Sequence, residues 1–226
     1  MIDGTDDLHH YSPWIRFKDI KWDEPNLASY LRSFKPNEII YHQQQYDDYV
    51  YLVKEGRIRI CIYSVEGNEQ CLTIAEEGSV FGELSAIDGL PNFGTAISLT
   101  NSNVYVVPKP FFLELIFFND GMTMKILQSL VKKVRVLSSN IQNLTFKDSY
   151  SRVITYLVKL AHSHGSFDGS RCELNMKFTH QEMANLTGLN RVTVSNIMSS
   201  LTTMGLISKA DGYMVIEDIN KLNDLK

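Results

Sequence analysis

The chain of 226 residues is 44% hydrophobic and 21% charged, which describes a folded protein with room for two domains rather than a disordered one. No apolar run approaches the roughly 20 residues that a membrane span needs, and the acidic, polar N-terminal segment is unlike a signal peptide, so we expect a cytoplasmic protein without membrane contact. The net charge of −4 is uneven, because residues 1–150 hold 14 basic and 19 acidic side chains whereas residues 151–226 hold 8 and 7. If the C-terminal part binds nucleic acid, it therefore relies on groove contacts more than on a strongly basic surface.

Cysteine and histidine positions argue against a metal centre. The cysteines are odd in number, widely separated and without a CxxC pair, so we expect reduced, mostly buried thiols. They are Cys61, Cys71 and Cys172. His162 and His164 form a potential ligand pair at a predicted helix end, but no third ligand is nearby in the sequence, and His9–His10 is a second such pair. No catalytic motif such as GxSxG occurs, so we expect no metal site, no catalytic residues and no enzyme.

From about Glu38 to Pro108 the sequence consists of short strand-like runs separated by turns. Apolar and polar residues alternate, and the runs break at three Glu-Gly pairs, which is typical of a small antiparallel barrel or jelly roll. The pairs occupy positions 55–56, 66–67 and 77–78. A glycine-rich segment at 81–98 interrupts the pattern. It can wrap a ligand with its backbone N–H groups, or it can be a tight connection between strands.

After Pro110 the pattern becomes helical. Six apolar residues are spaced by 3, 4, 3, 4 and 3 positions, which is the a/d seam of a two-stranded coiled coil. They are Leu127, Leu130, Val134, Leu137, Ile141 and Leu144. The alternative is a long helix that packs on its own domain, although so narrow a stripe fits a partner helix better. The pattern ends at residues 145–149, where Asp148 or Ser149 can cap the next helix.

The C-terminal segment has the features of a winged helix-turn-helix. Thr179 and Glu182 match a capping box that opens a short helix, and Gly188 allows a tight turn into a second helix. A helix stop at Gly205 and two short strands around Asp211–Gly212 complete the pattern. In this motif the second helix enters the major groove of DNA with its N-terminal residues at the base edges.

The second helix of this motif carries short polar side chains opposite its apolar stripe, with one arginine at its start. A solvated helix face usually carries long charged side chains, so this face suits base pairing in a groove better than water. The apolar stripe consists of Val194, Ile197, Met198 and Leu201. The predicted DNA-binding residues are Thr179, His180, Arg191, Val192, Thr193, Ser195 and Asn196.

The chain resembles the Crp/Fnr family of bacterial transcription regulators from about residue 30 to its end. The most specific similarities are FGEL at 81–84, NLTFKD at 143–148 and THQEMANLTGLNRVTVSNIMSSL at 179–201. Within the last of these, RVTVS resembles the branch that controls halorespiration genes in response to halogenated phenols. The family's usual R-E-T-V here reads Arg191-Val192-Thr193-Val194, without the glutamate that would accept a hydrogen bond from cytosine.

The resemblance implies an α+β protein with three parts. These are a cyclic-nucleotide-binding-like β-roll over residues 1–119, a dimerisation helix over 120–146 and a winged helix-turn-helix domain over 147–226. It also implies a homodimer that binds a small effector and double-stranded DNA and acts with RNA polymerase. The implied function is an effector-controlled transcription regulator that binds an inverted repeat. Val192 suits a thymine methyl group and Asn196 can pair with adenine, so we expect A·T-rich half-sites.

The sensor part departs from the members that bind cyclic AMP. Their Arg-Ser pair, which holds the cyclic phosphate, is replaced here by Phe93 and Gly94, and an aromatic ring cannot neutralise a phosphate. Their purine-binding threonine corresponds to Leu137, although Ser138 is retained. The cysteines of the oxygen-sensing branch are absent. We therefore expect no cofactor and an effector other than cyclic AMP, the alternative being a cyclic-nucleotide-responsive regulator or a cyclic-nucleotide-binding regulatory module.

The expected effector is a small anion on an apolar body, such as a phenolate or aromatic carboxylate. Lys133, at a g position beside the seam, is its predicted charge partner, and the alternative is that Lys133 pairs with a carboxylate of the partner helix. Glu83 can hydrogen-bond the effector or accept from local backbone N–H groups, and Ile87 adds to the apolar wall. The predicted effector-binding residues are Phe81, Gly82, Glu83, Leu84, Phe93, Gly94, Lys133, Leu137 and Ser138.

Overall fold

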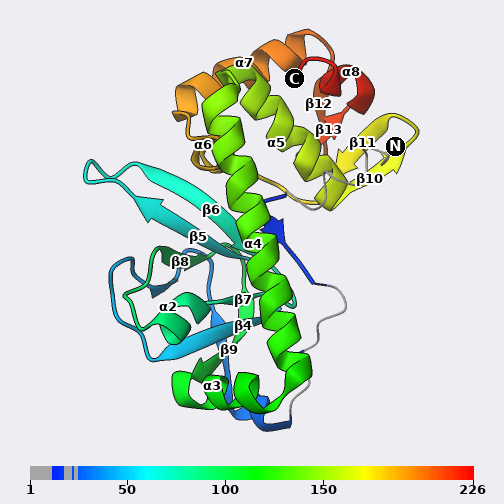
Figure 1. The fold of residues 1–226 in the computed structure, drawn as a ribbon. Helices are drawn as coiled ribbons and strands as arrows, with labels where there is room; N and C mark the ends of the chain where they lie inside the picture. Colours follow the sequence, from blue (N-terminus) through cyan, green and yellow to red (C-terminus); the bar gives the residue numbers. More distant parts are fainter. Residues whose placement is uncertain (1–11, 18–21, 23–24) are drawn as a thin grey trace, which may run out of the picture. The chain divides into compact units, whose positions relative to one another are not determined.

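The computed structural model describes residues 12–17, 22 and 25–226, and the chain forms two compact units. Pro13–Val134 make up the first unit, and Arg135–Lys226 belong to the second. The boundary falls inside the long helix α4 (Asp120–Phe146), so this helix contributes one half to each unit (Figure 1). None of the helices in the described part of the chain is long and apolar enough to cross a membrane.

The first unit is a β-roll of two sheets, as the alternating pattern predicts. Their strand orders are β1-β6-β5-β8-β3 and β2-β9-β4-β7 (Figure 1). The strands are β1 (Trp14–Ile15), β2 (Leu31–Phe34), β3 (Ile39–Tyr41), β4 (Tyr49–Glu55), β5 (Ile58–Tyr63), β6 (Glu69–Ala75), β7 (Val80–Phe81), β8 (Thr95–Ser98) and β9 (Ser102–Pro108). Every pairing within these sheets is antiparallel except that of β1 with β6, which is parallel and was not predicted.

Turns in the roll lie at the predicted Glu-Gly pairs. Gly56, Gly67 and Gly78 have φ angles of 98°, 82° and 80°, a region that glycine adopts without strain. Between the sheets, aromatic rings fill the core, with Tyr51 and Phe81 stacked at 4.9 Å between ring centroids and an interplanar angle of 11°. The expected roll is therefore confirmed, and stacked aromatic rings form part of its interior.

Three helical segments complete the first unit before α4 begins. They are the 3-10 helix η1 (Pro25–Tyr30), α2 (Glu83–Asp88) and α3 (Lys109–Phe118). Helix α2 occupies the glycine-rich segment at 81–98, which was interpreted as either a ligand-wrapping loop or a strand connection. Gly82 and Gly89 flank α2 with φ angles of 78° and 74°, so these glycines begin and end a short helix.

Helix α4 carries large apolar side chains on both a buried face and an exposed face. Met122 and Ile126 are buried in the core of the first unit, and Val136 is buried as well. Large apolar side chains on the other face are 46–64% exposed. They are Leu127, Val131, Val134, Ile141 and Leu144. Four of these five belong to the predicted seam, while Leu130 packs partly against the core of its own unit.

The second unit combines four helices with a sheet of order β10-β11-β13-β12. Its elements after α4 are α5 (Ser149–His164), β10 (Gly165–Asp168), β11 (Arg171–Leu174), α6 (His180–Thr187), α7 (Arg191–Thr203), β12 (Ile207–Ala210), β13 (Tyr213–Ile216) and α8 (Ile219–Asn223) (Figure 1). Asp148 caps α5 by accepting a hydrogen bond from the Ser151 backbone at 2.7 Å, as one of the two predicted caps. The β10–β11 hairpin was not predicted.

Candidate functional site

Helices α6 and α7 form the predicted helix-turn-helix. The Thr179 backbone N–H donates to Glu182 Oε2 at 2.6 Å, and the Glu182 backbone N–H donates to Thr179 Oγ1 at 3.1 Å, so the capping box is confirmed. Gly188 then turns the chain with φ 66° and ψ 28°, a left-handed conformation that suits glycine. Asn190 caps α7 by accepting from the Thr193 backbone at 2.8 Å. Local hydrogen bonds therefore fix where both helices begin.

The two faces of α7 are separated as the sequence predicts. Its apolar stripe of Val194, Ile197, Met198 and Leu201 is buried, which fixes the rotation of the helix in the unit. Arg191 and Asn196 are exposed, and Val192 is 69% exposed although it is apolar. Thr193 and Ser195 are half-buried. The first two turns of α7 therefore present short polar and apolar groups with one arginine.

The predicted two-stranded wing is present beside this helix pair. Strands β12 and β13 pair in an antiparallel hairpin, in which Lys209 lies opposite Met214. Asp211 and Gly212 form its turn with φ angles of 51° and 81°, the backbone that an Asp-Gly hairpin turn requires. Together with α6 and α7, this hairpin makes the second unit a winged helix-turn-helix.

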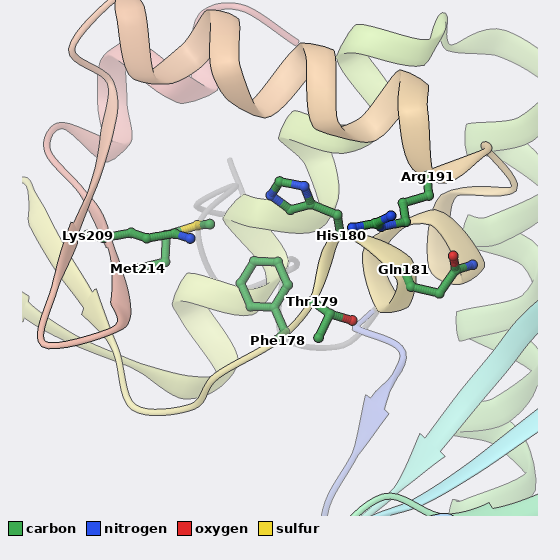
Figure 2. Close-up of a pocket in the computed structure, with 7 residues that line it drawn as sticks. All are labelled: Phe178, Thr179, His180, Gln181, Arg191, Lys209 and Met214. Carbon is green, nitrogen blue, oxygen red and sulfur yellow. The ribbon is translucent and has the colours of Figure 1, made fainter.

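A groove of about 510 Å³ lies between the start of α6, the start of α7 and the wing. It is lined by Phe178, Thr179, His180, Gln181, Arg191, Lys209 and Met214. Figure 2 shows that Lys209 and Met214 reach from the hairpin toward the start of α6, while Arg191 comes from the first turn of α7. Three basic side chains thus converge on one groove. Sequence reasoning found Thr179, His180 and Arg191 but missed Lys209, because only the fold brings the wing next to α6.

Electrostatics in this groove act on His180. Burial lowers the pKa of its imidazole below the usual value, and the positive charges of Lys209 and Arg191 lower this pKa further. The positive potential of the groove therefore disfavours the protonated, cationic form of His180 when no anion is bound. A DNA phosphate in the groove would reverse this effect, because an anion stabilises the charged imidazolium.

In the sensor unit, Glu83 and Lys133 form a buried ion pair. The Glu83 side chain is 1% exposed and its Oε1 lies 2.6 Å from Lys133 Nζ, which also donates to the Val80 carbonyl at 2.8 Å. Glu83 follows Gly82 at the start of α2, where an added Cβ on Gly82 would lie 2.9 Å from the Tyr51 ring. The pair thus connects α2 to α4. This pairing differs from both roles expected for Glu83, and it gives Lys133 a carboxylate partner within its own unit. The role of Lys133 as the charge partner of an effector stays a prediction.

The remaining predicted effector residues have different environments. Phe81 is 2% exposed and packs in the roll core, and its contact with an effector stays a prediction. Leu84 is 50% exposed and Phe93 is 68% exposed. Gly94 packs so closely on β5 that an added Cβ would lie 2.7 Å from the Cys61 carbonyl oxygen. Close backbone packing thus accounts for the glycine at this position.

Two further predictions concern residues outside the sensor roll. Leu137 and Ser138 belong to the second compact unit, whereas the other predicted effector residues belong to the first. Among the residues that the structure describes, no three His, Cys, Asp or Glu side chains are arranged to hold a metal ion. His162 instead lies beside the Phe167 ring, at 5.5 Å between centroids. His9–His10 lies outside the described residues.

Comparison with known families agrees with this architecture. A family model described as a cyclic nucleotide-binding domain matches residues 31–118, and a Crp-like helix-turn-helix domain model matches residues 151–225. The chain belongs to the Crp/Fnr family. As a Crp/Fnr protein it is an effector-responsive, DNA-binding transcription regulator and not an enzyme.

Individual Crp/Fnr relatives are distant but cover most of the chain. The CRP-like cAMP-activated global transcriptional regulator of Mycobacterium tuberculosis (strain H37Rv) is 25% identical over 189 residues, covering 84% of each chain. The structure of FixK2 from Bradyrhizobium japonicum superimposes with a TM-score of 0.73 at 22% identity, covering 87% of this chain and 96% of FixK2. That of OCPA-complexed CprK has a TM-score of 0.69 at 17% identity, covering 93% and 97%. The structural similarities establish the fold.

Operator binding should strengthen as the pH falls, because His180 gains a proton when a DNA phosphate raises its depressed pKa. The extra affinity is fully present at low pH and is lost as the pH rises through the pKa of the bound form, with a slope of at most about tenfold per pH unit for one proton. Lys209 from β12 and Arg191 from α7 are the charged groups that act on His180, and Glu182, two residues along α6, accepts from the Thr179 backbone. Fluorescence anisotropy between about pH 6 and about pH 8 measures this slope.

His180→Asn should remove most of the pH slope, whereas His42→Asn, which removes an exposed histidine of the sensor unit, should leave it unchanged. An equal slope in the His180→Asn protein and the unchanged protein would show that another group takes up the proton.

Proposed function

We propose that the protein is a homodimeric regulator that binds an inverted-repeat operator under the control of a small anionic effector. The observation that supports the DNA-binding part most directly is the N-terminal half of α7, where Arg191, Val192 and Asn196 are exposed. Arg191 also lines the groove with three basic side chains (Figure 2). In a winged helix-turn-helix this is the part of the helix that reads base edges. Action together with RNA polymerase is part of the same proposal.

The dimer is supported by the exposed apolar face of α4. Val134 and Ile141 are 62% and 64% exposed, one heptad apart, although both are large aliphatic side chains. Their burial against a second α4 would stabilise the assembly by about 1.5–3 kcal/mol for each fully buried side chain. A contiguous apolar stripe on an otherwise polar helix surface is the pattern that coiled-coil partners bury.

Val134→Glu/Ile141→Glu should convert the protein to a monomer, because each glutamate would place a charge in the seam. These positions test the seam better than Leu130, which also packs within its own unit. Gln128→Glu/Gln142→Glu adds the same charge on exposed positions of α4 and should remain dimeric. Analytical ultracentrifugation distinguishes the two species, and a stable Val134→Glu/Ile141→Glu dimer would contradict the assignment of the interface.

The operator should be an A·T-rich inverted repeat with half-sites about one helical turn apart. Asn196 can pair with adenine, Val192 can contact a thymine methyl group, and Arg191 can bind guanine or a phosphate. Selection from random DNA measures this preference. Asn196→Ala should lose about 1–3 kcal/mol of discrimination at one position of the half-site. Recovery of a G·C-rich core, or of no repeat, would contradict this reading of the helix.

Val192→Glu is the matched test of specificity, because it restores a carboxylate that can accept a hydrogen bond from cytosine N4. It should therefore shift the selected base opposite position 192 from thymine toward cytosine while the rest of the half-site stays the same. An unchanged selection would show that Val192 does not face a base.

The effector is proposed to be an anion, other than a cyclic nucleotide, that competes with Glu83 for Lys133. The cation is positioned by the Val80 carbonyl, and the half-exposed Leu84 and Ile87 offer apolar surface on α2 next to Glu83. Displacing Glu83 would change the contact between α2 and α4, and Lys133 is adjacent to the seam residue Val134. An anion that binds one arrangement better than the other can then shift the population of active dimers.

Glu83→Gln should bind such an anion more tightly than the unchanged protein, because the competing carboxylate is removed while Lys133 remains. Compared with Glu83→Gln, the double variant Glu83→Gln/Lys133→Met should bind the anion about 10- to 150-fold more weakly, because it loses one charge-assisted hydrogen bond. The double variant is preferable to Lys133→Met alone, which would leave Glu83 buried without a counter-ion at a cost of about 3–5 kcal/mol. Calorimetry with benzoate, phenylacetate and pentachlorophenol measures the affinities, with cyclic AMP as the competing candidate.

Sub-micromolar binding of cyclic AMP that switches on operator binding would overturn the effector proposal. Equal weakening in Glu83→Gln and in the double variant would instead show that the ion pair is only structural.

A further inference from the structure

Three lysines gather in the second unit, where α4 meets α5. Lys147 lies in the link between the two helices, Lys159 lies within α5, and Lys226 follows α8. Burial and then the charges of Lys147 and Lys226 lower the pKa of Lys159 to about 8. Burial and the charge of Lys147 likewise lower the pKa of Lys226 to about 8. The ammonium groups are therefore close enough to repel one another.

Lys147 and Lys159 contact neutral groups, and Lys159 Nζ also lies 5.3 Å from the centroid of the Tyr156 ring. Lys147 Nζ donates to Thr155 Oγ1 at 2.6 Å, and Lys159 Nζ donates to Ser139 Oγ at 3.0 Å. Within the described part of the chain, none of the three lysines is in an ion pair. Lys159 is moreover 2% exposed, and a buried cation without a counter-ion is costly. An anion bound beside this cluster would offset that cost.

A cavity of about 460 Å³ opens at the same place, which is a usual size for a small-molecule site. It is lined by Gln142, Phe146, Lys147, Asp148, Ser151 and Lys226. Asp148 is the carboxylate among these residues, and it accepts the Ser151 backbone N–H as the cap of α5. Two lysine side chains thus line the cavity together with one carboxylate side chain, which caps α5. Phe146 is 80% exposed and offers a ring face to a flat group.

We propose that this cavity binds a small molecule that carries a phosphate group. Its phosphate oxygens would accept hydrogen bonds from Lys147 and Lys226, and a flat ring, where the ligand has one, would stack on Phe146. The phosphate can belong to a free phosphate compound or to a nucleotide, and the two share the same recognition by lysine. The cavity lies within the second unit, whereas the Glu83–Lys133 pair lies in the first, so this inference does not depend on the proposed effector.

Isothermal titration calorimetry of the full chain with pyrophosphate, and separately with ATP, at constant ionic strength tests the site. We expect saturable binding that is about 10- to 150-fold weaker in Lys147→Met, as for the loss of one charge-assisted hydrogen bond. Lys147→Arg keeps the positive charge and should retain binding. Binding by this variant would show that a substitution at position 147 leaves the fold intact. Lys221→Met is the matched control, because it removes the same charge from an exposed position of α8.

The two ligands distinguish the source of the phosphate. Tighter binding of ATP that is lost in Phe146→Ala assigns the site to nucleotides, whereas equal affinities assign it to phosphate compounds without a ring.

Affinity should fall as the pH rises above about 8, because a bound anion raises the lysine pKa values and needs their protonated forms. Arg191→Ala should bind both ligands normally, which separates this site from the DNA interface. Absence of saturable binding, or equal weakening in Lys147→Met and Lys221→Met, would overturn the proposal.

Discussion

Helix α4 is apolar on two sides, and this constraint organises the molecule. One side is buried by the chain itself, through Met122 and Ile126 in the sensor unit and Val136 in the DNA-binding unit. The other side leaves Val134 and Ile141 more than half exposed. An exposed apolar stripe on a helix is stabilised when another surface covers it. The single chain covers one side, and the proposed dimer covers the other.

The sensor unit carries a charged pair between the short helix α2 and the long helix α4. Lys133 and Glu83 satisfy each other at 2.6 Å in a buried position, which makes either residue costly to remove alone. The pair connects a short helix to the long one, so an anion that replaces Glu83 acts on both helices together. Phe93 stands at the position where the family's cyclic-nucleotide-binding members carry arginine, and it is largely exposed to solvent. Lys133 therefore has Glu83 as its partner in this structure, and the proposed effector anion would have to compete with that carboxylate.

The DNA-binding unit combines a nearly neutral charge balance with a locally positive groove. Arg191, His180 and Lys209 come from three different elements and converge on one cavity (Figure 2). The exposed short side chains on α7 are the groups proposed to contact bases. Because few charges are involved, non-specific attraction to DNA should be modest, and specificity depends on the fit of α7 in the groove. The lysine cluster at the start of α5 adds a second positive region that is not part of this interface.

The sequence by itself determined the features that depend on neighbouring residues. The Glu-Gly turns, the Thr179–Glu182 capping box and the Asp211–Gly212 wing turn were predicted because each depends on backbone conformations and hydrogen bonds within a few positions. The apolar periods of α4 and α7 were predicted for the same reason, since a helix repeats every 3.6 residues. The candidate DNA-contacting residues on α7 followed from its period and its caps.

Only the tertiary structure decided which distant residues meet. Glu83 and Lys133 are 50 positions apart, and no local pattern indicates that they pair. The same holds for Lys209 beside His180, for the parallel pairing of β1 with β6 and for the lysines near α5. Phe81 illustrates the limit most directly, because its aromatic ring suits either an open wall or a core. Stacking on Tyr51 decided for the core, since contacts made between strands, rather than the residue's own preference, set the direction of a side chain.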